Sequence, residues 1–480
     1  MSTHVTPSVW PESPPTHAHR AAYADAVGRS FWLDRLPRRV PDAPLAGAAD
    51  ADLCIVGGGF TGLWAAIHAK TADPARDVVL LEAQTIGFGA SGRNGGFLVA
   101  SLTHGISNGE ARFADELAVL ERLGQENYAG LRADLERLGV ACDFEETGEL
   151  MVAVEPHQEP WLEEEAELLR RYGHEVELLD GAAMREQIAS PIYRGGVWDK
   201  SGAAIVDPAK LAVGLADAAR RLGVRIHEQT PATGLRRAGD AVDVAVPGGS
   251  VRARRVLLAT SAFPPLLRSL RHYIAPVYDY VLVTEPLSAE QLASIGWADR
   301  QGIGDPGNQF HYYRLTDDNR ILWGGYDAVY RYGGPVGPDH DQHDATFARL
   351  AQHFAITFPQ LEGVRFTHRW GGAIDTCSRF SVFFGTAHGG RVSYAVGYTG
   401  LGVGATRFGA QVALDLVDGR QTEATALRYV RSKPVPFPPE PLRSGVIQLT
   451  RNRLAAADRN AGERGLWLRT LDRLGLGFDS

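Results

Sequence analysis

Lysine and cysteine are scarce in this chain of 480 residues, which holds four lysines and three cysteines. Cys54, Cys142 and Cys377 are far apart and odd in number, which argues against a disulfide framework and against a zinc site. Such cysteine usage predicts a reducing, cytoplasmic location. No lysine lies between Lys210 and Lys433, so this long stretch offers no candidate for a catalytic lysine.

Long apolar runs and basic blocks are also absent. No stretch approaches the ~18 apolar residues that a membrane helix needs, so we expect no membrane span. The Pro-rich N-terminus lacks the basic-then-apolar pattern of a secretory signal. The chain has 49 basic and 57 acidic residues, and its net charge of −8 argues against a nucleic-acid partner. The length predicts two intertwined domains.

A glycine-rich turn between two apolar runs organises the rest of the chain. Residues 53–56 read as a strand, and residues 57–62 form the pattern G-x-G-x-x-G directly before an expected helix at 63–70. A second expected strand, 78–81, ends at Glu82, about 20 residues after the last glycine. Together these features predict a dinucleotide site, because the first amides of the helix attract a phosphate.

Each part of the motif has a physical role. Gly57 lets the chain turn sharply off the strand, Gly59 lets the backbone approach a pyrophosphate, and Gly62 lets the helix pack closely. Glu82 is placed to bind ribose hydroxyls, which favours FAD or NAD over NADP. The motif alone does not separate FAD from NAD.

The loop at residues 87–96 favours FAD. It reads Gly-Phe-Gly-Ala-Ser-Gly-Arg-Asn-Gly-Gly and suits a chain that passes beside the pyrophosphate toward a flavin ring. With this loop the sequence resembles the FAD-dependent amine and amino-acid oxidase superfamily that includes D-amino-acid oxidase, glycine oxidase and sarcosine oxidase. The amino-acid sequence of the loop is most similar to that of the gamma-glutamylputrescine-oxidase-like branch, and the resemblance covers about residues 30–419.

The resemblance implies an α/β fold in which a Rossmann-like FAD-binding domain is interleaved with a mixed-sheet α+β substrate domain. We expect Phe31 and Trp32 to anchor the N-terminal arm by packing, and we assign no role to the helical stretches of the C-terminal tail. The expected division is an arm at 1–49, an FAD-binding domain at 50–104, 196–266 and 364–425, a substrate domain at 105–195 and 267–363, and a tail at 426–480.

A second glycine-rich segment, residues 397–404, precedes an expected helix at 405–418. It resembles the C-terminal FAD segment of the family, whose amides point at the flavin N1 and C2 carbonyl edge. The resemblance implies the following FAD contacts: Gly57, Gly59, Phe60, Thr61, Gly62, Glu82, Ala83, Gln84, Gly89, Ala90, Ser91, Arg93, Asn94, Gly95, Gly96, Phe97, Ala232, Ala259, Thr260, Gly371, Gly397, Thr399, Gly400, Leu401, Gly402 and Val403.

Three departures from the family pattern bear on the chemistry. Sarcosine-oxidase-like enzymes have a histidine that holds a substrate carboxylate where this chain has Leu401, which argues against a simple amino-acid substrate. They also use a lysine to assist oxygen, and none is available here. Their covalent flavin cysteine aligns near Trp370, and Cys377 comes too late in the chain, so we expect non-covalent FAD.

The expected substrate sheet is dense in aromatic residues, which suit a wall over a flavin and equally suit ordinary core packing. These residues are Tyr278, Tyr280, Tyr312, Tyr313, Trp323 and Tyr326. The scattered histidines, His104 and His311 among them, are expected in the core or on the surface. Our candidates for the substrate pocket are Arg93, Tyr278, Tyr312, Arg314, Trp370 and Leu401.

We therefore predict an enzyme that oxidises the C–N bond of a small-molecule amine substrate to an imine or aldehyde, and we predict no metal. The resemblance implies hydride transfer to flavin N5, with oxygen as acceptor and hydrogen peroxide as product. Two alternatives stay open. One is a flavin dehydrogenase with another electron acceptor, and the other is a flavin monooxygenase driven by NAD(P)H, against which the lack of a second dinucleotide fingerprint argues.

Overall fold

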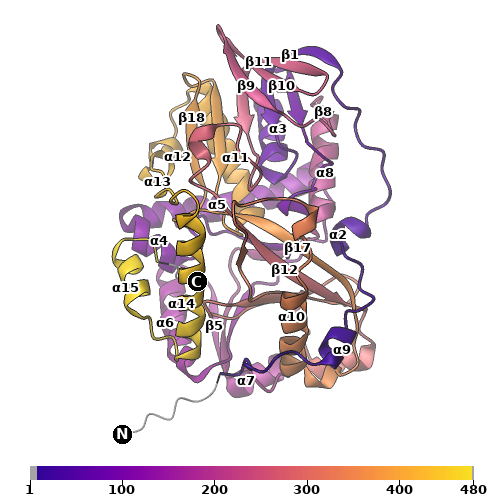
Figure 1. The fold of residues 1–480 in the computed structure, drawn as a ribbon, viewed down its shortest axis with the longest axis vertical. Coiled ribbons are helices and arrows are strands. Elements are labelled where there is room, and N and C mark those ends of the chain that lie inside the picture. Colours follow the sequence, from indigo (N-terminus) through magenta and orange to yellow (C-terminus); the bar gives the residue numbers. More distant parts are fainter. Residues whose placement is uncertain (1–7, 478–480) are drawn as a thin grey trace.

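The computed structural model describes residues 8–477, so the first seven residues of the expected arm and the last three of the expected tail lie outside the described residues. The described chain forms two large sheets, which lie one above the other in Figure 1. A third sheet is small and pairs β3 (Phe97–Val99) with β7 (Ala203–Ile205). This architecture confirms the predicted α/β fold with a Rossmann-like half and a mixed-sheet half.

The upper sheet has eight strands, and five of them are parallel neighbours, as in a dinucleotide-binding fold. In spatial order the strands are β18 (Phe383–Ala387), β19 (Val392–Val396), β11 (Gly249–Leu258), β1 (Gly47–Val56), β2 (Val78–Leu81) and β8 (Arg225–His227), and β10 (Ala241–Val246) and β9 (Gly234–Ala238) continue from β11 as an antiparallel meander.

Side chains of β1 alternate between two packed layers. Leu53 and Ile55 pack among the helices α3 (Phe60–Ala72), α8 (Pro208–Arg221) and α11 (Gly402–Asp418). Cys54 and Val56 pack on the other face with residues of the meander. A strand that is buried on both faces appears in the sequence as an unbroken apolar run, which is why 53–56 could be identified as a strand.

The lower sheet has nine strands of mixed direction. Its two ends are β16 and β5, and β17 pairs with β12 outside the main path. The strands are β16 (Val329–Tyr330), β12 (Ala275–Thr284), β15 (Ile321–Gly325), β14 (His311–Leu315), β13 (Gly302–Gly304), β4 (Glu149–Ala153), β6 (Gly195–Asp199) and β5 (Val176–Asp180), with β17 (Phe366–Thr376). The polar run Thr-Asp-Asp-Asn at residues 316–319 predicts a turn between two strands, and the hairpin β14–β15 confirms it.

The other helices cover the sheets and the edges of the molecule. Asp207 directly before a proline predicts the start of a helix, and the structure confirms it, because the Asp207 carboxylate accepts bonds from the amides of Ala209 and Lys210. The remaining helices are α1 (His17–Ala21), α2 (Phe31–Asp34), α4 (Ile106–Phe113), α5 (Leu117–Leu138), α6 (Glu159–Arg171), α7 (Gly181–Gln187), α9 (Ala289–Ile295), α10 (Asp344–Thr357), α12 (Glu423–Ala426), α13 (Arg428–Arg431), α14 (Leu442–Arg459) and α15 (Leu466–Arg473).

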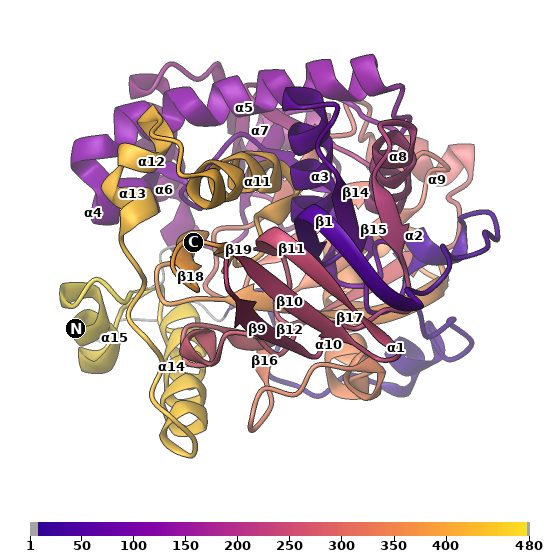
Figure 2. The ribbon, with the colours of Figure 1, turned by 90° about the horizontal axis from the view of Figure 1, so that it is seen from above.

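The expected domain boundaries need correction at three places. β17 pairs along its length with β12, so the chain returns to the upper sheet only after residue 376 and not at 364. β6 likewise extends the lower sheet to residue 199, past the expected boundary at 196. Helix α5 was assigned to the substrate domain, but its buried leucines pack in one cluster with α3 and α11, and Figure 2 shows it beside them.

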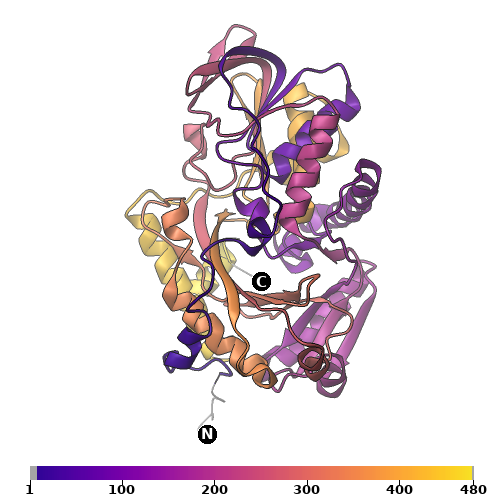
Figure 3. The same ribbon diagram turned by 90° about the vertical axis from the view of Figure 1, so that its right-hand side faces the viewer.

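The described N-terminal arm and the C-terminal tail lie along different sides of the molecule (Figure 1). The arm climbs from the lower half, where Ser8 donates to Glu155, to the upper half, where Arg39 pairs with the buried Glu228 (Figure 3). The tail helices α14 and α15 lie on the opposite side in Figure 1. Within residues 8–477, no helix combines the length and the apolar character needed to cross a membrane.

Candidate active site

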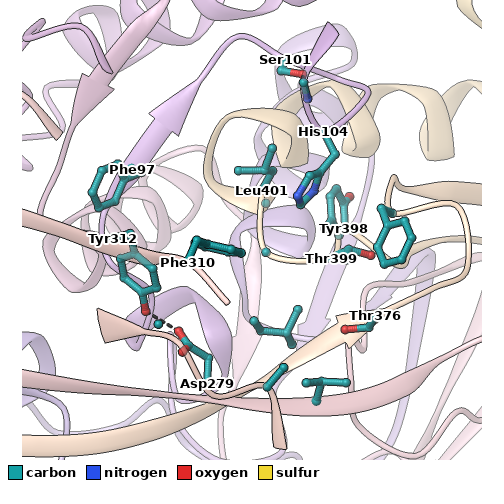
Figure 4. Close-up of a pocket in the computed structure, with 18 of the residues that line it drawn as sticks. Phe97, Ser101, His104, Asp279, Phe310, Tyr312, Thr376, Tyr398, Thr399 and Leu401 are labelled. Carbon is teal, nitrogen blue, oxygen red and sulfur yellow. Dashed lines mark hydrogen bonds between the residues drawn. The ribbon is translucent and has the colours of Figure 1, made fainter. Parts of the chain in front are cut away.

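A cavity of about 760 Å³ is lined by residues of both halves. The upper half contributes the glycine-rich turn, the loop that follows Glu82 and the start of α11. The lower half contributes one face of β12, β13, β14 and β4, and the tail helices α14 and α15 add a further wall. Figure 4 shows side chains from both halves pointing into this space.

The glycine-rich turn is closed toward the sheet and open toward the cavity. Gly57 has φ +115°, and a Cβ there would collide with the carbonyl of Ala259. A Cβ at Gly62 would collide with the carbonyl of Gly57, so only glycine lets α3 pack this close. Gly59 lies on the cavity, where a Cβ would meet only the Ser91 side chain, at 2.9 Å.

The start of α3 is tied to the two other segments that approach the cavity. The Phe60 amide donates to Ser91 Oγ at 3.0 Å, and Thr61 Oγ1 donates to the Tyr398 hydroxyl at 2.9 Å. The helix N-terminus is thereby fixed against both glycine-rich loops. Its unpaired amides carry partial positive charge, which suits a pyrophosphate.

Glu82 ends β2 beside the turn. Its carboxylate accepts bonds from the amides of Gly58 at 2.7 Å and Gln84 at 2.8 Å, and burial raises its pKa. These bonds fix a carboxylate at the end of the second strand, where a dinucleotide-binding fold holds the ribose.

Three side chains from outside the loop at residues 87–96 donate hydrogen bonds to the backbone carbonyls of residues 92–94. Ser30 Oγ donates to the carbonyl of residue 92 at 2.7 Å. Trp370 Nε1 donates to that of residue 93 at 2.9 Å, and Trp32 Nε1 to that of residue 94 at 2.9 Å. We call these three residues the loop clamp. Trp32 belongs to the N-terminal arm, so the arm supports the predicted cofactor loop in addition to packing.

The late glycine-rich loop is held by Asp375. Its carboxylate accepts a bond from the Gly397 amide at 2.7 Å, and burial raises its pKa to about 6. Gly397 and Gly400 have φ of +86° and +97°, and Thr399 also has a positive φ of +52°. The loop therefore leads into α11 through a left-handed backbone that favours glycine, with the first amides of the helix near the cavity.

Tyr312 and Asp279 form a hydrogen-bonded pair on the lower wall (Figure 4). The tyrosine hydroxyl donates to the carboxylate, and burial raises the pKa of Asp279 to about 6. The Tyr312 ring packs edge-on against Phe97 at 5.8 Å between centroids, and a Cβ at Gly95 would approach that ring to 2.7 Å. Asp279 was not predicted, although a lone carboxylate inside an aromatic strand is a readable signal.

Because side chains alternate along a strand, some aromatic residues of the lower sheet face the cavity and others face the core. Tyr312 and Tyr326 line the cavity, whereas Tyr313 packs on Trp323 in the core at 4.4 Å between ring centroids. Tyr278 reaches the lining but is 1% exposed, and its hydroxyl bonds to the Gly337 backbone. The aromatic density therefore serves mostly the core.

Two of the predicted pocket residues do not line the cavity. Arg314 is 1% exposed and donates to the carbonyl of Val206 at 2.7 Å, so it braces the wall from behind. Trp370 is fully buried in the loop clamp. Arg93 does line the cavity, but an ion pair of 2.5 Å with Asp341 fixes its guanidinium.

Leu401 and His104 project into the same part of the cavity in Figure 4. His104 was expected in the core or on the surface, and burial lowers its pKa to about 4, which favours the neutral ring. His311, by contrast, is fully buried behind the cavity lining, with Nδ1 2.9 Å from Asp305.

The predicted FAD residues divide into two sets. Those that line the cavity are Gly59, Phe60, Thr61, Ala90, Ser91, Arg93, Asn94, Gly95, Phe97, Ala259, Thr399, Gly400, Leu401, Gly402 and Val403. Those that lie outside the lining are Gly57, Gly62, Glu82, Ala83, Gln84, Gly89, Gly96, Ala232, Thr260, Gly371 and Gly397. The second set includes Gly57 and Gly62 of the turn, which shape the site, and Glu82, which flanks it.

The residues present fit FAD. A glycine turn open to the cavity, a helix N-terminus and a fixed carboxylate at the end of the second strand are the groups that a dinucleotide requires. The Cys377 thiol is buried and lies 3.2 Å from the Ser381 carbonyl, outside the cavity lining. In the described part of the chain, no group of three or more metal-ligating side chains is suited to a metal ion.

Comparison with known proteins agrees with this geometry. Residues 52–416 match the DAO family of FAD dependent oxidoreductases. The chain belongs to this family. FAD is therefore its cofactor, and the protein is an FAD-dependent oxidoreductase.

The similarity to individual proteins also covers most of the chain. A "Gamma-glutamylputrescine oxidoreductase" of Escherichia coli (strain K12) is 36% identical over 85% of this chain and 93% of its own length. A "Probable oxidoreductase OrdL" of Haemophilus influenzae is 29% identical over 83% and 90%. The crystal structure of glycine oxidase from Geobacillus kaustophilus shares the fold, with a TM-score of 0.66 and 21% identity over 78% and 96%.

Proposed function

We propose that this enzyme oxidises an amine to an imine, which water converts to an aldehyde. The observation that carries the proposal is the Tyr312–Asp279 pair, a carboxylate and a hydroxyl set in a largely apolar wall of the cavity that the FAD-binding segments also line. A buried carboxylate attracts an ammonium group, and apolar neighbours suit an alkyl chain. The name of the Escherichia coli relative, which denotes an amine substrate, supports the same class.

Bound FAD would supply a two-electron acceptor for this reaction. Asp279 would accept hydrogen bonds from the incoming ammonium and take one proton at its carboxylate, leaving the nitrogen lone pair free. The hydroxyl of Tyr312 would keep that carboxylate in place. Leu401 and Phe97 would pack on the alkyl chain and exclude water from the reacting carbon.

The cofactor itself would be held by three parts of the chain. The amides at the start of α3 would take the pyrophosphate, and Glu82 would take ribose hydroxyls. The amides at the start of α11 would face the edge of the ring where negative charge gathers. FAD retention therefore depends on the loops that the clamp and Asp375 hold.

We further propose oxygen as the electron acceptor, so that hydrogen peroxide is the second product. One observation favours the alternative, a dehydrogenase that passes its electrons to an acceptor other than oxygen. No lysine is among the residues that line the cavity in the described chain, whereas the resembling oxidases use a lysine to assist oxygen. The acceptor is therefore tested separately from the substrate.

The test is an anaerobic absorbance titration of the yellow protein with polyamines, glutamyl-polyamines, N-methyl amino acids and D-amino acids, with NADPH as a separate addition. We expect an amine to bleach the flavin band, and a bleach by NADPH alone would favour a monooxygenase. Air is then admitted. Rapid recovery of colour with peroxide indicates an oxidase, and slow recovery that an artificial acceptor accelerates indicates a dehydrogenase.

A further inference from the structure

One end of the cavity is lined by three carboxylates from separate elements: Glu149 of β4, Glu165 of α6 and Asp199 of β6. Glu149 and Asp199 are direct partners across the two strands. Burial, together with the neighbouring carboxylates Asp199 and Glu165, raises the pKa of Glu149 to about 7. The carboxylates therefore repel one another in a part of the cavity that water reaches poorly, where the charged form of Glu149 lacks a partner among the described residues.

Glu121 on α5 also lines the cavity, and His174 lies between its carboxylate and that of Asp199. It is 8% exposed, and its Oε1 has no hydrogen-bond partner among the residues that the structure describes. A buried carboxylate oxygen without a partner is costly, and a bound cation would satisfy it. This oxygen is independent of the other three carboxylates and points to a ligand with hydrogen-bond donors.

His174 supplies only one compensating charge. Its Nδ1 lies 2.7 Å from Asp199 Oδ2 and its Nε2 lies 3.7 Å from Glu121 Oε2. Burial alone would lower the pKa of His174, yet the two carboxylates raise it to about 9. The nearby Lys200 is paired with Glu177 at 2.7 Å, and Arg171 lies 3.3 Å from Glu110. Four carboxylates therefore face one imidazolium.

The register of the lower sheet sets the distance from this end to the proposed reaction site. Tyr312 pairs with Gly304, Gly304 with Met151 and Met151 with Val197, and all four residues line the cavity. Glu149 lies on the same face, two residues along β4 from Met151. Two strand spacings and two residues place it about 12 Å from Tyr312.

Apolar side chains of the cavity wall suit a hydrocarbon chain. Trp161 and Leu169 lie on α6 one helical turn before and after Glu165, and Leu468 and Leu471 of α15 also line the cavity. Arg464 also reaches this wall and is paired with Asp472 at 2.8 Å. An extended alkyl chain could thus run from Asp279 to the carboxylates.

We propose that Glu121, Glu149, Glu165 and Asp199 form a distal cation subsite, which binds a second ammonium group of the substrate about 12 Å from the amine that is oxidised. The proposal rests on the proposed function and narrows its substrate class to long diamines and polyamine derivatives. A second ammonium would donate a hydrogen bond to the Glu121 oxygen that has no partner among the described residues, and its charge would offset the repulsion among the carboxylates.

The test compares octylamine with the straight-chain octane diamine that carries an amine at each end. In the wild-type enzyme we expect kcat/KM for flavin reduction to favour the diamine by about tenfold or more. Glu149→Gln and Glu121→Gln should each remove most of this preference through KM, with kcat nearly unchanged. Glu167→Gln is the matched control, because Glu167 lies on α6 beside Glu165 but is exposed, and it should keep the preference.

Anaerobic titration calorimetry with the same two amines tests the subsite without turnover. Tighter binding of the diamine that is lost in Glu149→Gln supports the subsite. Equal binding of both amines, unchanged in the two variants, overturns it even if both amines bleach the flavin. If neither amine bleaches the flavin, the proposed function fails for these compounds, and the calorimetry still decides the subsite.

Discussion

At the scale of residues, alternation along β12 decides which side chains reach the cavity. Asp279 faces the cavity with Val277 and Val281, whereas the Tyr280 hydroxyl turns to the other face and donates to the His340 carbonyl at 2.9 Å. A carboxylate in this position has little water, so its charged form is disfavoured. Its ionisation should therefore be visible in the stability of the protein.

We expect Asp279→Asn to become more stable relative to the wild type as the pH rises. The pKa of Asp279 is raised to about 6 in the folded protein, whereas an unfolded aspartate titrates near 3.9. The contribution of the protonated carboxyl to stability is thus complete below pH ~4 and is lost as the pH rises through about 6. Thermal unfolding of both proteins at about pH 5 and pH 7 measures the change. Parallel profiles would contradict it.

We also expect Gly59→Leu to lose FAD. The leucine side chain would occupy the cavity side of the turn, where the backbone must approach the pyrophosphate. Affinity for FAD should fall at least about tenfold, which is ~1.4 kcal/mol.

The ratio of flavin to protein absorbance after purification measures this loss. Gly234→Ala is the control, since its Cβ meets nothing within 4 Å, and it should stay yellow. A fully loaded Gly59→Leu protein would show that the turn does not hold the cofactor.

At the scale of elements, the arm and the cofactor loop depend on each other. Ser30 and Trp32 donate to two carbonyls of the loop, and Trp370 of β17 donates to the carbonyl between them. The loop therefore receives support from one element of the N-terminal arm and one strand of the lower sheet. Packing was the only role that the sequence suggested for Trp32.

Trp32→Phe should weaken FAD binding by about five- to tenfold, because a lost buried hydrogen bond costs about 1 kcal/mol or more. Trp297→Phe is a matched control. It removes a buried indole bond to the Gln301 carbonyl, in the core of the lower half. We expect the two variants to lose similar thermal stability but only Trp32→Phe to release FAD on dilution. Equal FAD retention would refute the clamp.

At the scale of the whole molecule, the tail closes one side of the cavity. Residues of α14 and α15 line it, including Ile447, Leu454, Leu468 and Leu471. The FAD-binding segments lie in the upper half and do not include the tail. Removal of α15 should thus affect substrate more than cofactor.

We expect a protein truncated after residue 459 to stay yellow but to show a KM for the diamine at least about tenfold higher, because apolar contacts to the alkyl chain are lost. Steady-state kinetics and the flavin absorbance of the truncated protein measure both quantities. A colourless protein, or one with an unchanged KM, would contradict this role of the tail.

The cofactor half of the molecule could be predicted from the amino-acid sequence alone. The glycine turn, Glu82 and the loop at 87–96 lie within 45 residues of chain, where each role follows from local backbone chemistry. The same locality made β2, the cap at Asp207 and the hairpin β14–β15 predictable.

The substrate side of the cavity could not be predicted in this way, because it depends on contacts between distant parts of the chain. Asp279 and Tyr312 lie 33 residues apart in the chain, on different strands, and the distal carboxylates come from α5, β4, α6 and β6. Sequence patterns do not state which strands pair or which face turns inward when both faces are buried, as the placement of Arg314 and Trp370 behind the wall illustrates. Register and packing between the two halves bring these side chains to one cavity, and these are properties of the folded chain alone.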